Sequence, residues 1–348
     1  MPQPGKQRRI EDRMSSLLSR KKALIICPAC GQNLNSVEGE FQCSVCARKY
    51  PSESGIPLLF LPNEWDASKE DVTEVIKSFY EETPFPNYED ADSIWRLKEK
   101  AEKGVFARLL DEQIPLQATV LEVGCGTGQL SNFLAIRAER AVFATDICLN
   151  SLKLGQEFKE RNQLGNLVFL QMNLFRPVFK PETFDVVIGN GVLHHTSDPF
   201  LGFKSIAKLV KRGGFIIVGL YNKYGRLTTD MRRFIFRISD NRFQFLDPRL
   251  KESSLSDKRK RTWFMDQYKN PHESKHTIGE ILEWFKQCGF EFINSIPKAV
   301  AFESFSKEER LFEKKPSGTK VDHLIVQLNL LFTGGREGGF FIMIGCKQ

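Results

Sequence analysis

Four of the eight cysteines form two identically spaced pairs near the start of the chain. They read C-x-x-C, then twelve residues, then C-x-x-C, and they comprise Cys27, Cys30, Cys43 and Cys46. Each pair bends the backbone so that two thiolates converge, and two pairs complete a tetrahedral shell around one zinc ion. Because four thiolates leave no open coordination position, we expect this zinc to be structural rather than catalytic. Two disulfides are the alternative for these residues.

A glycine-rich turn is the second motif that indicates a functional site. Residues 122–128 read E-V-G-C-G-T-G, and Asp146 follows 18 residues after Gly128. Alternate glycines let the backbone turn tightly from a strand into a helix and let a ligand approach the helix N-terminus. A carboxylate at the end of the next strand can accept hydrogen bonds from both ribose hydroxyls. The spacing differs from the dinucleotide fingerprint G-x-G-x-x-G, which argues against NAD.

Charge and apolar patterning narrow the class of protein further. The chain of 348 residues carries a formal net charge of +7. It has no apolar run near the roughly 18 residues that a membrane-spanning helix needs, and its N-terminus lacks the apolar core of a secretory signal. The four other cysteines lie scattered in apolar segments, and free thiols beside a metal site fit a reducing compartment. We therefore expect a cytoplasmic protein without a membrane span.

The elements that position these groups alternate between strand and helix from residue 118 onward. This alternation predicts an α/β fold, a doubly wound seven-stranded and mostly parallel sheet of Rossmann-like type, beside a small N-terminal zinc ribbon. The predicted strands are 119–123, 141–145, 167–170, 184–189, 215–220, 290–296 and 340–345. The predicted helices between them lie near 129–139, 150–162, 199–210 and 278–288.

The chain divides into four predicted regions. They are a basic flexible tail at 1–22, a zinc ribbon at 23–62, a helical linker or lid at 63–112, and a main domain at 113–348 with insertions at 221–275 and 298–338. Within the linker we predict helices at 66–83 and 94–112. The two prolines at 84 and 86 place an extended aromatic segment between them. This segment is either a plain linker or a cover over the ligand cleft.

Residues 118–221 combine several motifs that resemble class I S-adenosylmethionine-dependent methyltransferases of the type 11-like group. These are E-x-G-x-G-x-G at 122–128, L-Q-M-N at 170–173, F-D-V-V-I-G-N-G-V-L-H-H at 184–195 and K-R-G-G at 211–214. The ending V-L-H-H is similar to the branch that includes quinone-biosynthesis and other small-molecule methyltransferases. Residues 24–61 resemble the short zinc-ribbon proteins that serve as methyltransferase activators.

The resemblance implies S-adenosylmethionine as cofactor and assigns residues to it. The implied set is Glu122, Gly124, Cys125, Gly126 and Gly128 beside the methionine part, Asp146 on the ribose, Ile147 on the adenine, and Asn190 at the methionine end. Asn173 stands where the family usually has an aspartate facing the adenine amino group. An asparagine carbonyl can accept that same hydrogen bond.

Three histidines are candidate catalytic residues. His194 and His195 follow the fourth strand of the sheet, and His276 precedes the capping box T-I-G-E at 277–280. Methyl transfer needs a base only when the acceptor carries a proton to lose. A histidine can act as that base or serve only in packing, and His272 has a similar claim to substrate contact.

The segment 223–261 is strongly basic, with twelve Lys and Arg against five acidic residues. It lies in the first insertion and also holds many aromatic residues, and Arg232, Arg233 and Arg237 with Phe234 and Phe236 predict an amphipathic helix. We expect the insertions to roof the acceptor site. A basic, aromatic roof suits an acceptor with phosphate or carboxylate, a carrier-protein surface or RNA. A solvated basic face is the alternative.

Three functions follow from these features. We expect first a methyltransferase that acts on a small or carrier-bound, anionic metabolite. The second is a methyltransferase of ribosomal or transfer RNA, since a zinc ribbon before this domain resembles some ribosomal-RNA guanine methyltransferases. The third is a cofactor-binding scaffold without turnover, which binds a protein partner through the ribbon. The fourth strand lacks the N/D-P-P-aromatic motif of nucleobase amine methylation, which disfavours that acceptor.

Overall fold

The computed structural model describes residues 24–37, 40–65, 70–86, 88, 93–253, 255–333 and 338–348. The predicted tail at 1–22 lies outside the described residues. The main sheet comprises β6 (Thr119–Val123), β7 (Ala141–Asp146), β8 (Leu167–Gln171), β9 (Phe184–Asn190), β10 (Val210–Tyr221), β11 (Phe290–Ile296) and β12 (Phe340–Lys347). All seven predicted strands are present in it.

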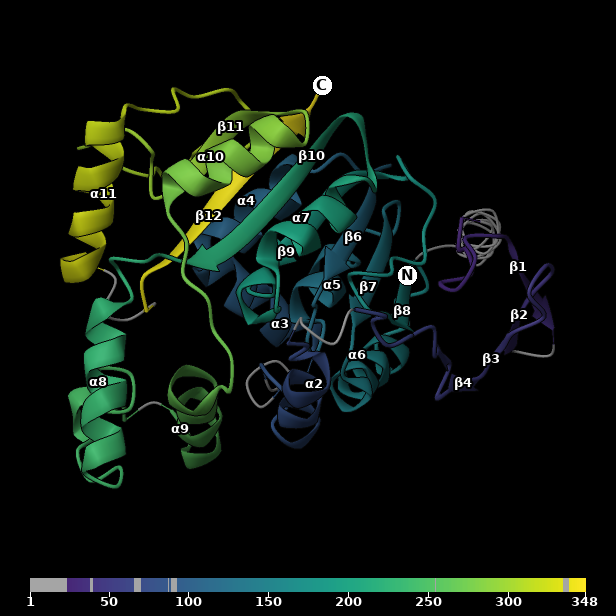
Figure 1. Cartoon of the computed structure of the whole chain (residues 1–348), viewed down its shortest axis with the longest axis horizontal. Helices are drawn as coiled ribbons and strands as arrows, with labels where there is room; N and C mark the ends of the chain where they lie inside the picture. The colour runs from purple at the N-terminus through teal and green to yellow at the C-terminus, as the bar shows by residue number, and fades with distance from the viewer. Residues whose placement is uncertain are drawn as a thin grey trace.

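The sheet has the order β11-β12-β10-β9-β6-β7-β8 (Figure 1). The five strands from β10 to β8 run parallel, whereas β12 is antiparallel to both β10 and β11. Every residue of β6 is buried, because helices cover both faces of the sheet. The predicted doubly wound, mostly parallel architecture is confirmed.

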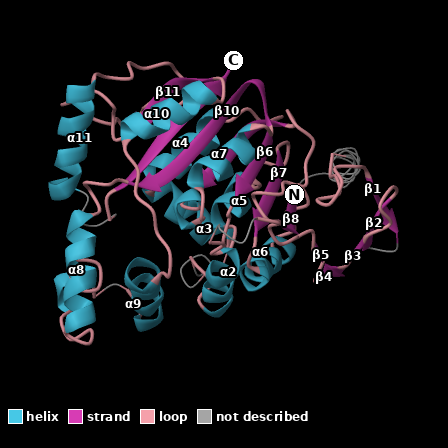
Figure 2. Cartoon of the chain, viewed as in Figure 1, coloured by secondary structure: helices cyan, strands magenta, loops and turns pink. Residues whose placement is uncertain are grey.

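Helices pack on both faces of this sheet (Figure 2). One face packs against α7 (Pro199–Ala207) and α10 (Ile278–Gln287), and the core there also includes side chains of the ribbon. The other face packs against α3 (Ile94–Lys103), α4 (Val105–Gln113), α5 (Gln129–Leu134) and α6 (Leu149–Arg161). Alternation along each strand divides its side chains between the two cores, as Val120 and Leu121 of β6 illustrate.

The linker helices differ from the prediction at two points. The first helix, α2, spans Thr73–Glu82 and begins after residues 70–72, and the side chain of Asp71 accepts a hydrogen bond from the backbone N–H of Thr73 at 2.9 Å. Residues 66–69 of the predicted helix lie outside the described residues. The second predicted helix is broken into α3 and α4 because Gly104 has an extended backbone (φ −88°, ψ 104°). Glycine lowers the stability of a helix interior, so a break falls there at little cost.

The ribbon is a small antiparallel unit that joins the main sheet at its edge. It consists of β1 (Leu34–Val37), β2 (Glu40–Cys43) and β3 (Lys49–Tyr50), followed by β4 (Ser52–Glu53) and β5 (Ile56–Pro57). After β5, the N–H of Leu59 donates to the carbonyl of Gln171 in the edge strand β8 at 3.0 Å. On the other side of the ribbon, the N–H of Ile26 donates to the carbonyl of Val178 at 2.8 Å. Backbone pairing therefore covers part of an otherwise open sheet edge.

Both insertions form helices along one side of the molecule, at the left in Figure 1. The first forms α8 (Leu227–Ile238), a 3-10 turn (Gln244–Leu246), α9 (Asp257–Phe264) and a π-helical turn (Met265–Lys269), and the second contains α11 (Lys320–Thr333). The predicted amphipathic helix is thus α8. No helix within the described residues combines the length and apolar character that crossing a bilayer requires.

Candidate active site

A cleft of about 500 Å³ lies where the carboxyl ends of β6, β7, β9 and β10 meet. The glycine turn, α2 and α3 contribute further walls. This is the position at which open α/β sheets bind their ligands. Eight of the nine residues predicted to bind cofactor line the cleft, namely Glu122, Gly124, Cys125, Gly126, Asp146, Ile147, Asn173 and Asn190.

The carboxylate of Asp146 accepts a hydrogen bond from the backbone of the glycine turn. Its Oδ2 accepts from the N–H of Gly126 at 2.7 Å, and its Oδ1 accepts from the N–H of Cys148 at 2.9 Å. These bonds fix the carboxylate plane, and each oxygen retains a second lone pair for a ligand hydroxyl. Burial raises the pKa of Asp146 above its usual value of 3.8. Gly124 and Gly126 have φ angles of +66° and +54°, which an L side chain disfavours.

The other predicted cofactor residues differ in how freely they face the cleft. Gly128 does not line it and caps α5 instead, where a β-carbon would lie 2.5 Å from the Phe169 ring. The side-chain amide of Asn173 donates to the carbonyl of Leu61 at 2.9 Å, and its Oδ1 accepts from the N–H of Phe175 at 3.0 Å. The Asn173 carbonyl oxygen therefore has one lone pair left for a ligand.

Two buried polar groups stand at the inner end of the cleft. Glu122 is hydrogen-bonded to the hydroxyl of Ser131, and burial raises its pKa to about 7. The Oδ1 atom of Asn190 is buried without a hydrogen-bond partner among the described residues. An orphaned buried carbonyl costs free energy unless a ligand or water donates to it. Asn190 therefore marks a point where a bound donor is expected.

The predicted aromatic segment covers the glycine turn. A β-carbon at Gly126 would lie 2.2 Å from the carbonyl oxygen of Phe85, so only glycine fits beneath that segment. The hydroxyl of Thr127 donates to the carbonyl of Pro86 at 2.5 Å, and the hydroxyl of Tyr88 donates to the carbonyl of Thr127 at 2.8 Å. Phe85 and Pro86 line the cleft together with Tyr80 of α2. We call α2 and residues 83–86 the cover.

His194 and His195 form a short 3-10 turn (Leu193–His195) after β9, and both line the cleft. The Nδ1 atom of His195 lies 2.8 Å from the carbonyl oxygen of His272. Since a carbonyl only accepts, Nδ1 carries a proton, and Nε2 of the neutral ring is left with its lone pair. Burial lowers the pKa of His195 below 6.5. His194 is also buried, its pKa lies well below that value, and its Nδ1 has no described partner.

Nε2 of His195 faces a polar cluster that the sequence did not predict. The hydroxyl of Tyr80 lies 3.4 Å from this nitrogen and donates to Oδ1 of Asp266 at 2.9 Å. The side-chain amide of Asn270 donates to the same hydroxyl at 2.9 Å. Tyr80, His195 and Asp266 all line the cleft. The charge of Asp266 acts against the burial effect on His195, because a nearby carboxylate favours the imidazolium.

The structure does not bring His276 into the cleft, contrary to our expectation. Its Nδ1 lies 2.9 Å from Oε1 of Glu280 and its Nε2 lies 2.8 Å from the Ser274 hydroxyl, so both ring nitrogens are engaged. The predicted capping box is present, with Thr277 and Glu280 bonding reciprocally at the start of α10. His276 thus belongs to the packing around this helix start, beside Trp284.

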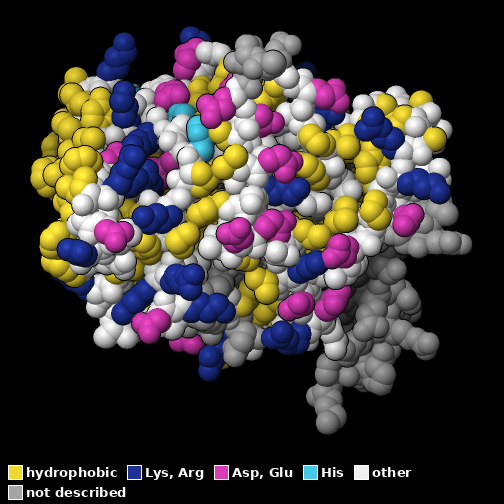
Figure 3. All heavy atoms as spheres, turned by 60° about the horizontal axis from the view of Figure 1, so that its bottom comes forward, with side chains coloured by type: hydrophobic (Ala, Val, Ile, Leu, Met, Phe, Trp, Pro, Cys, Tyr) yellow, Lys and Arg dark blue, Asp and Glu magenta, His cyan; other side chains and the backbone are white. Residues whose placement is uncertain are grey.

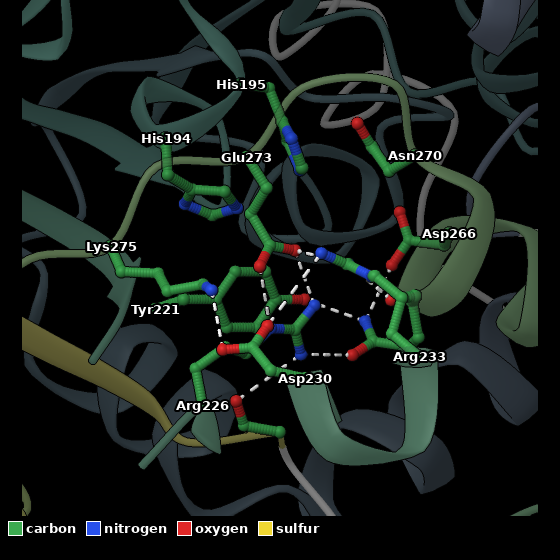
Figure 4. A network of polar contacts seen from close by, with 12 residues as sticks. His194, His195, Tyr221, Arg226, Asp230, Arg233, Asp266, Asn270, Glu273 and Lys275 are labelled. Atoms are coloured by element: carbon green, nitrogen blue, oxygen red, sulfur yellow. Dashed lines mark hydrogen bonds and ion pairs between the residues drawn. The ribbon is translucent and has the colours of Figure 1, made fainter. Parts of the chain in front are cut away.

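A buried ion-pair network lies next to the histidines (Figure 4). Arg226 is fully buried and pairs with the carboxylate of Glu273, and its guanidinium carbon lies 3.6 Å from the centre of the Tyr221 ring. Arg233 donates to the same carboxylate at 3.2 Å. Gln267 links Arg226 to the Tyr221 hydroxyl through bonds of 2.6 and 2.7 Å. Part of the predicted basic roof therefore holds the first insertion on the sheet instead of facing a substrate.

The four cysteines of the ribbon converge. Their sulfur atoms all lie within 4.8 Å of one another, with Cys30 and Cys43 separated by 3.4 Å. The backbone N–H groups of Cys46 and Val45 donate to the sulfur of Cys43, and these donors lower the pKa of Cys43 to about 6. Two N–H groups directed at one sulfur favour the thiolate, which is the form that binds metal.

Comparisons with known proteins agree with this geometry. Residues 121–218 match a family model described as "Methyltransferase domain". The chain is 25% identical to the uncharacterized protein syc1184_c of Synechococcus over 65% of its own length and 61% of that relative. It is 31% identical to a ubiquinone biosynthesis O-methyltransferase of Albidiferax ferrireducens over 30% of its length and 41% of that relative. The chain thus spans less than two thirds of either relative.

The fold is similar to that of a solved structure, PKMT2 from Rickettsia typhi in complex with AdoHcy. That match has a TM-score of 0.50 at 18% identity and covers 68% of this chain and 50% of that one. The sheet order, the glycine turn with Asp146 and the family match together define the class: a Rossmann-like methyltransferase domain. Residues 121–218 are thus similar to a methyltransferase domain, and they lie on a sheet of Rossmann-like order.

We expect the buried ion pair to contribute strongly to folding. Replacing Arg226 by Met leaves the negative charge of Glu273 buried without its main cationic partner. Removing one partner of such a pair typically lowers the free energy of unfolding by about 3–5 kcal/mol. Urea unfolding of Arg226→Met measures this loss directly. The control is Lys103→Met, because the pair of Lys103 with Glu99 is exposed and such pairs contribute about 0.3–0.5 kcal/mol. Equal losses in both variants would show that Arg226 is not a structural anchor.

Proposed function

We propose that the cleft binds S-adenosylmethionine. We further propose that the protein transfers the methyl group of this cofactor to a hydroxyl on a mainly apolar acceptor. The observation that carries the proposal is the placement of His195. Its ring is held by the His272 carbonyl so that the unprotonated Nε2 faces the cleft. Asp146 and the glycine turn lie in the same cleft, so the two functions share one space.

The residues present fit this cofactor. The Asp146 carboxylate has free lone pairs for two ribose hydroxyls, and the glycine turn leaves backbone space beside it. The orphaned Oδ1 of Asn190 offers an acceptor to the ammonium of the methionine part. Ile147 and Met172 supply apolar surface for the adenine. When bound, the cofactor supplies an electrophilic methyl group on a sulfonium, so the chain mainly positions donor and acceptor.

The residues near His195 can remove the acceptor proton as the methyl group is transferred. Neutral Nε2 takes the proton of the attacking hydroxyl, and the resulting imidazolium donates from Nδ1 to the His272 carbonyl. The carboxylate of Asp266, bridged by the Tyr80 hydroxyl, stabilises that positive charge. His195 and Asp266 are both buried, and electrostatic interactions between buried groups are stronger than in water.

The walls of the cleft favour an uncharged acceptor over the anionic one that the sequence suggested. Among the described lining residues, Lys100 is the single Lys or Arg, and it donates to Gln129 beside the glycine turn. At the acceptor end the walls are His194, Tyr221, Phe340 and Asp266. Several relatives carry the name ubiquinone biosynthesis O-methyltransferase, which is consistent with a phenolic hydroxyl on an apolar body. An RNA acceptor stays a prediction that no described contact favours.

For the ribbon, we propose one structural zinc ion held by its four cysteine thiolates. The convergence of the four sulfur atoms and the N–H donors to Cys43 support it. The ribbon joins the main sheet through Leu59 and Ile26, so its zinc would stabilise the edge next to β8. A ribbon bound to this chain's own sheet leaves a protein partner as a prediction only.

Removing the Asp146 carboxylate should weaken binding of S-adenosylhomocysteine about tenfold or more, because charge-assisted hydrogen bonds to the ribose are lost. Calorimetry on wild type and Asp146→Ala tests this. The control is Glu157→Ala, which removes an exposed carboxylate on α6. This variant should bind S-adenosylhomocysteine as the wild type does. Unchanged affinity in Asp146→Ala would refute the ribose assignment.

Replacing His195 by Gln should lower kcat about 10²–10⁴-fold, the usual contribution of a positioned base. The rate is measured with radiolabelled S-adenosylmethionine and the best small phenol from an acceptor screen. Because burial lowers the pKa of His195, the base is neutral at pH 7, and the wild-type rate should fall only below about pH 6.5 as the ring is protonated.

Controls separate His195 from other groups that titrate. Glu122 has a pKa of about 7, so an acidic limb that persists in His195→Gln would belong to Glu122. His323→Gln changes a buried histidine of α11 that does not line the cleft, and it should retain wild-type kcat. Full activity in His195→Gln would exclude it as the base.

The zinc assignment predicts about one equivalent of zinc per chain when the protein is purified without chelator. Cys43→Ser should lose most of this metal and unfold at a lower temperature, since the fourth ligand is missing. Cys288→Ser, a partly buried cysteine outside the ribbon, should retain the metal. Elemental analysis that finds far less than one equivalent in wild type would contradict the assignment.

A further inference from the structure

Helix α8 presents its apolar stripe to the solvent. Leu227, Met231, Phe234 and Ile238 follow one another at intervals of four, three and four residues, which places them on one side of the helix. Met231, Phe234 and Ile238 are each 64–68% exposed. The side that packs on the protein has Phe236, which is buried against aromatic rings of the first insertion. A surface helix ordinarily places its apolar side toward the core, so this orientation needs a reason.

Helix α11 continues the same apolar surface. Val321, Leu324, Leu328 and Phe332 are exposed, whereas Val326 and Leu330 of the same helix are buried. A β-carbon at Gly225 would lie 2.8 Å from the β-carbon of Leu330, so α11 is seated directly on the segment that begins α8. Figure 3 shows hydrophobic side chains gathered along this side of the molecule, where α8 and α11 lie in Figure 1.

The loop after α8 adds Phe243, Phe245 and Leu246 to this surface. We call these three residues and the two exposed stripes the apolar face. It contains 11 of the 17 large hydrophobic side chains that are exposed among the described residues. Scattered single hydrophobic residues are normal on a protein surface, but a concentration of this kind marks an interaction site.

Positive charge borders the apolar face. Arg237 lies in the last turn of α8, Arg242 and Lys251 follow in the same insertion, and all three are exposed. The Nζ atom of Lys251 stands 6.0 Å from the centre of the Phe245 ring. Within the segment 223–261, Arg226 and Arg233 turn inward to Glu273, and ten other Lys and Arg stand against five acidic residues. Apolar residues bordered by cations are the signature of a helix that lies in the interface of an anionic membrane.

We propose that the apolar face binds the surface of an anionic lipid bilayer, with the exposed side chains of α8 and α11 inserted at the headgroup level. The charge decides between this occupant and a second copy of the chain. Two copies joined through this face would bring like-charged segments together, whereas anionic headgroups neutralise them. This binding does not depend on methyl transfer.

The position of the face connects it to the cleft. Tyr221 lines the acceptor end and closes β10, and α8 begins six residues later. Phe340 lines the same end and opens β12, seven residues after the end of α11. If the proposed function holds, a membrane-borne acceptor with an apolar body would reach the cleft from this side. Loss of the methyl transfer would leave the lipid-binding proposal untouched.

Vesicle flotation of the full chain tests the proposal. We expect binding to phosphatidylcholine vesicles that contain about one third phosphatidylglycerol, and at least about tenfold weaker binding to pure phosphatidylcholine. The variant Phe234→Gln/Ile238→Gln should bind the anionic vesicles about tenfold more weakly or worse, and Leu324→Gln/Leu328→Gln should also bind more weakly. Trp95→Gln removes a similarly exposed aromatic residue on α3 and should bind as wild type does.

Each contrary result identifies a different error. Unchanged vesicle binding by both double variants would overturn the proposal and would point to other basic segments of the chain. A wild type that binds neither kind of vesicle would overturn it too. If light scattering showed a wild-type dimer that Phe234→Gln/Ile238→Gln converts to a monomer, the occupant would be a second copy. Circular dichroism and thermal unfolding of every variant confirm that the changes act on binding rather than on folding.

Discussion

The hydrogen bond between the Gly126 N–H and the Asp146 carboxylate is the constraint on which the cleft depends. It joins the turn after β6 to the end of β7, so the two parts of the site that must hold one ligand cannot move apart independently. The bond requires a left-handed backbone at the turn, which glycine adopts at little cost. The parallel sheet supplies the rest, because it brings the carboxyl ends of adjacent strands to the same edge.

The same turn has a second requirement, imposed from outside the sheet. The Phe85 carbonyl approaches Gly126 so closely that any side chain there would collide with it. This contact joins the cover to the turn after β6, although Phe85 and Gly126 are about forty residues apart in the sequence. Tyr80 shows why this matters for chemistry: it comes from α2, yet its hydroxyl bridges His195 and Asp266. The proposed acid–base machinery is thus complete only when the cover is in place.

The sequence predicted the parts of the fold that repeat a local pattern. All seven strands, the capping box at Thr277 and the convergence of the four cysteines followed from periodicity, capping chemistry and spacing. It failed where position depends on tertiary contacts. Asp266 sits in a π-helical turn whose register no apolar period reveals, so its place in the cleft was not foreseen. His276 was expected in the cleft from its position near a helix start, but strand and helix order do not specify which way a side chain turns.

In the first insertion, the amino-acid composition suggests one role and the placement of the side chains in the structure suggests another. Its sequence is basic and aromatic, which suggests a roof that binds an anionic substrate. In the structure, Arg226 and Arg233 turn inward to Glu273, whereas the apolar stripe of α8 (Leu227, Met231, Phe234 and Ile238) turns outward. A buried arginine requires a charged partner, whereas an exposed apolar stripe gains nothing from water. The ion pair therefore anchors the insertion and leaves the apolar stripe outside, where the proposed lipid contact would cover it.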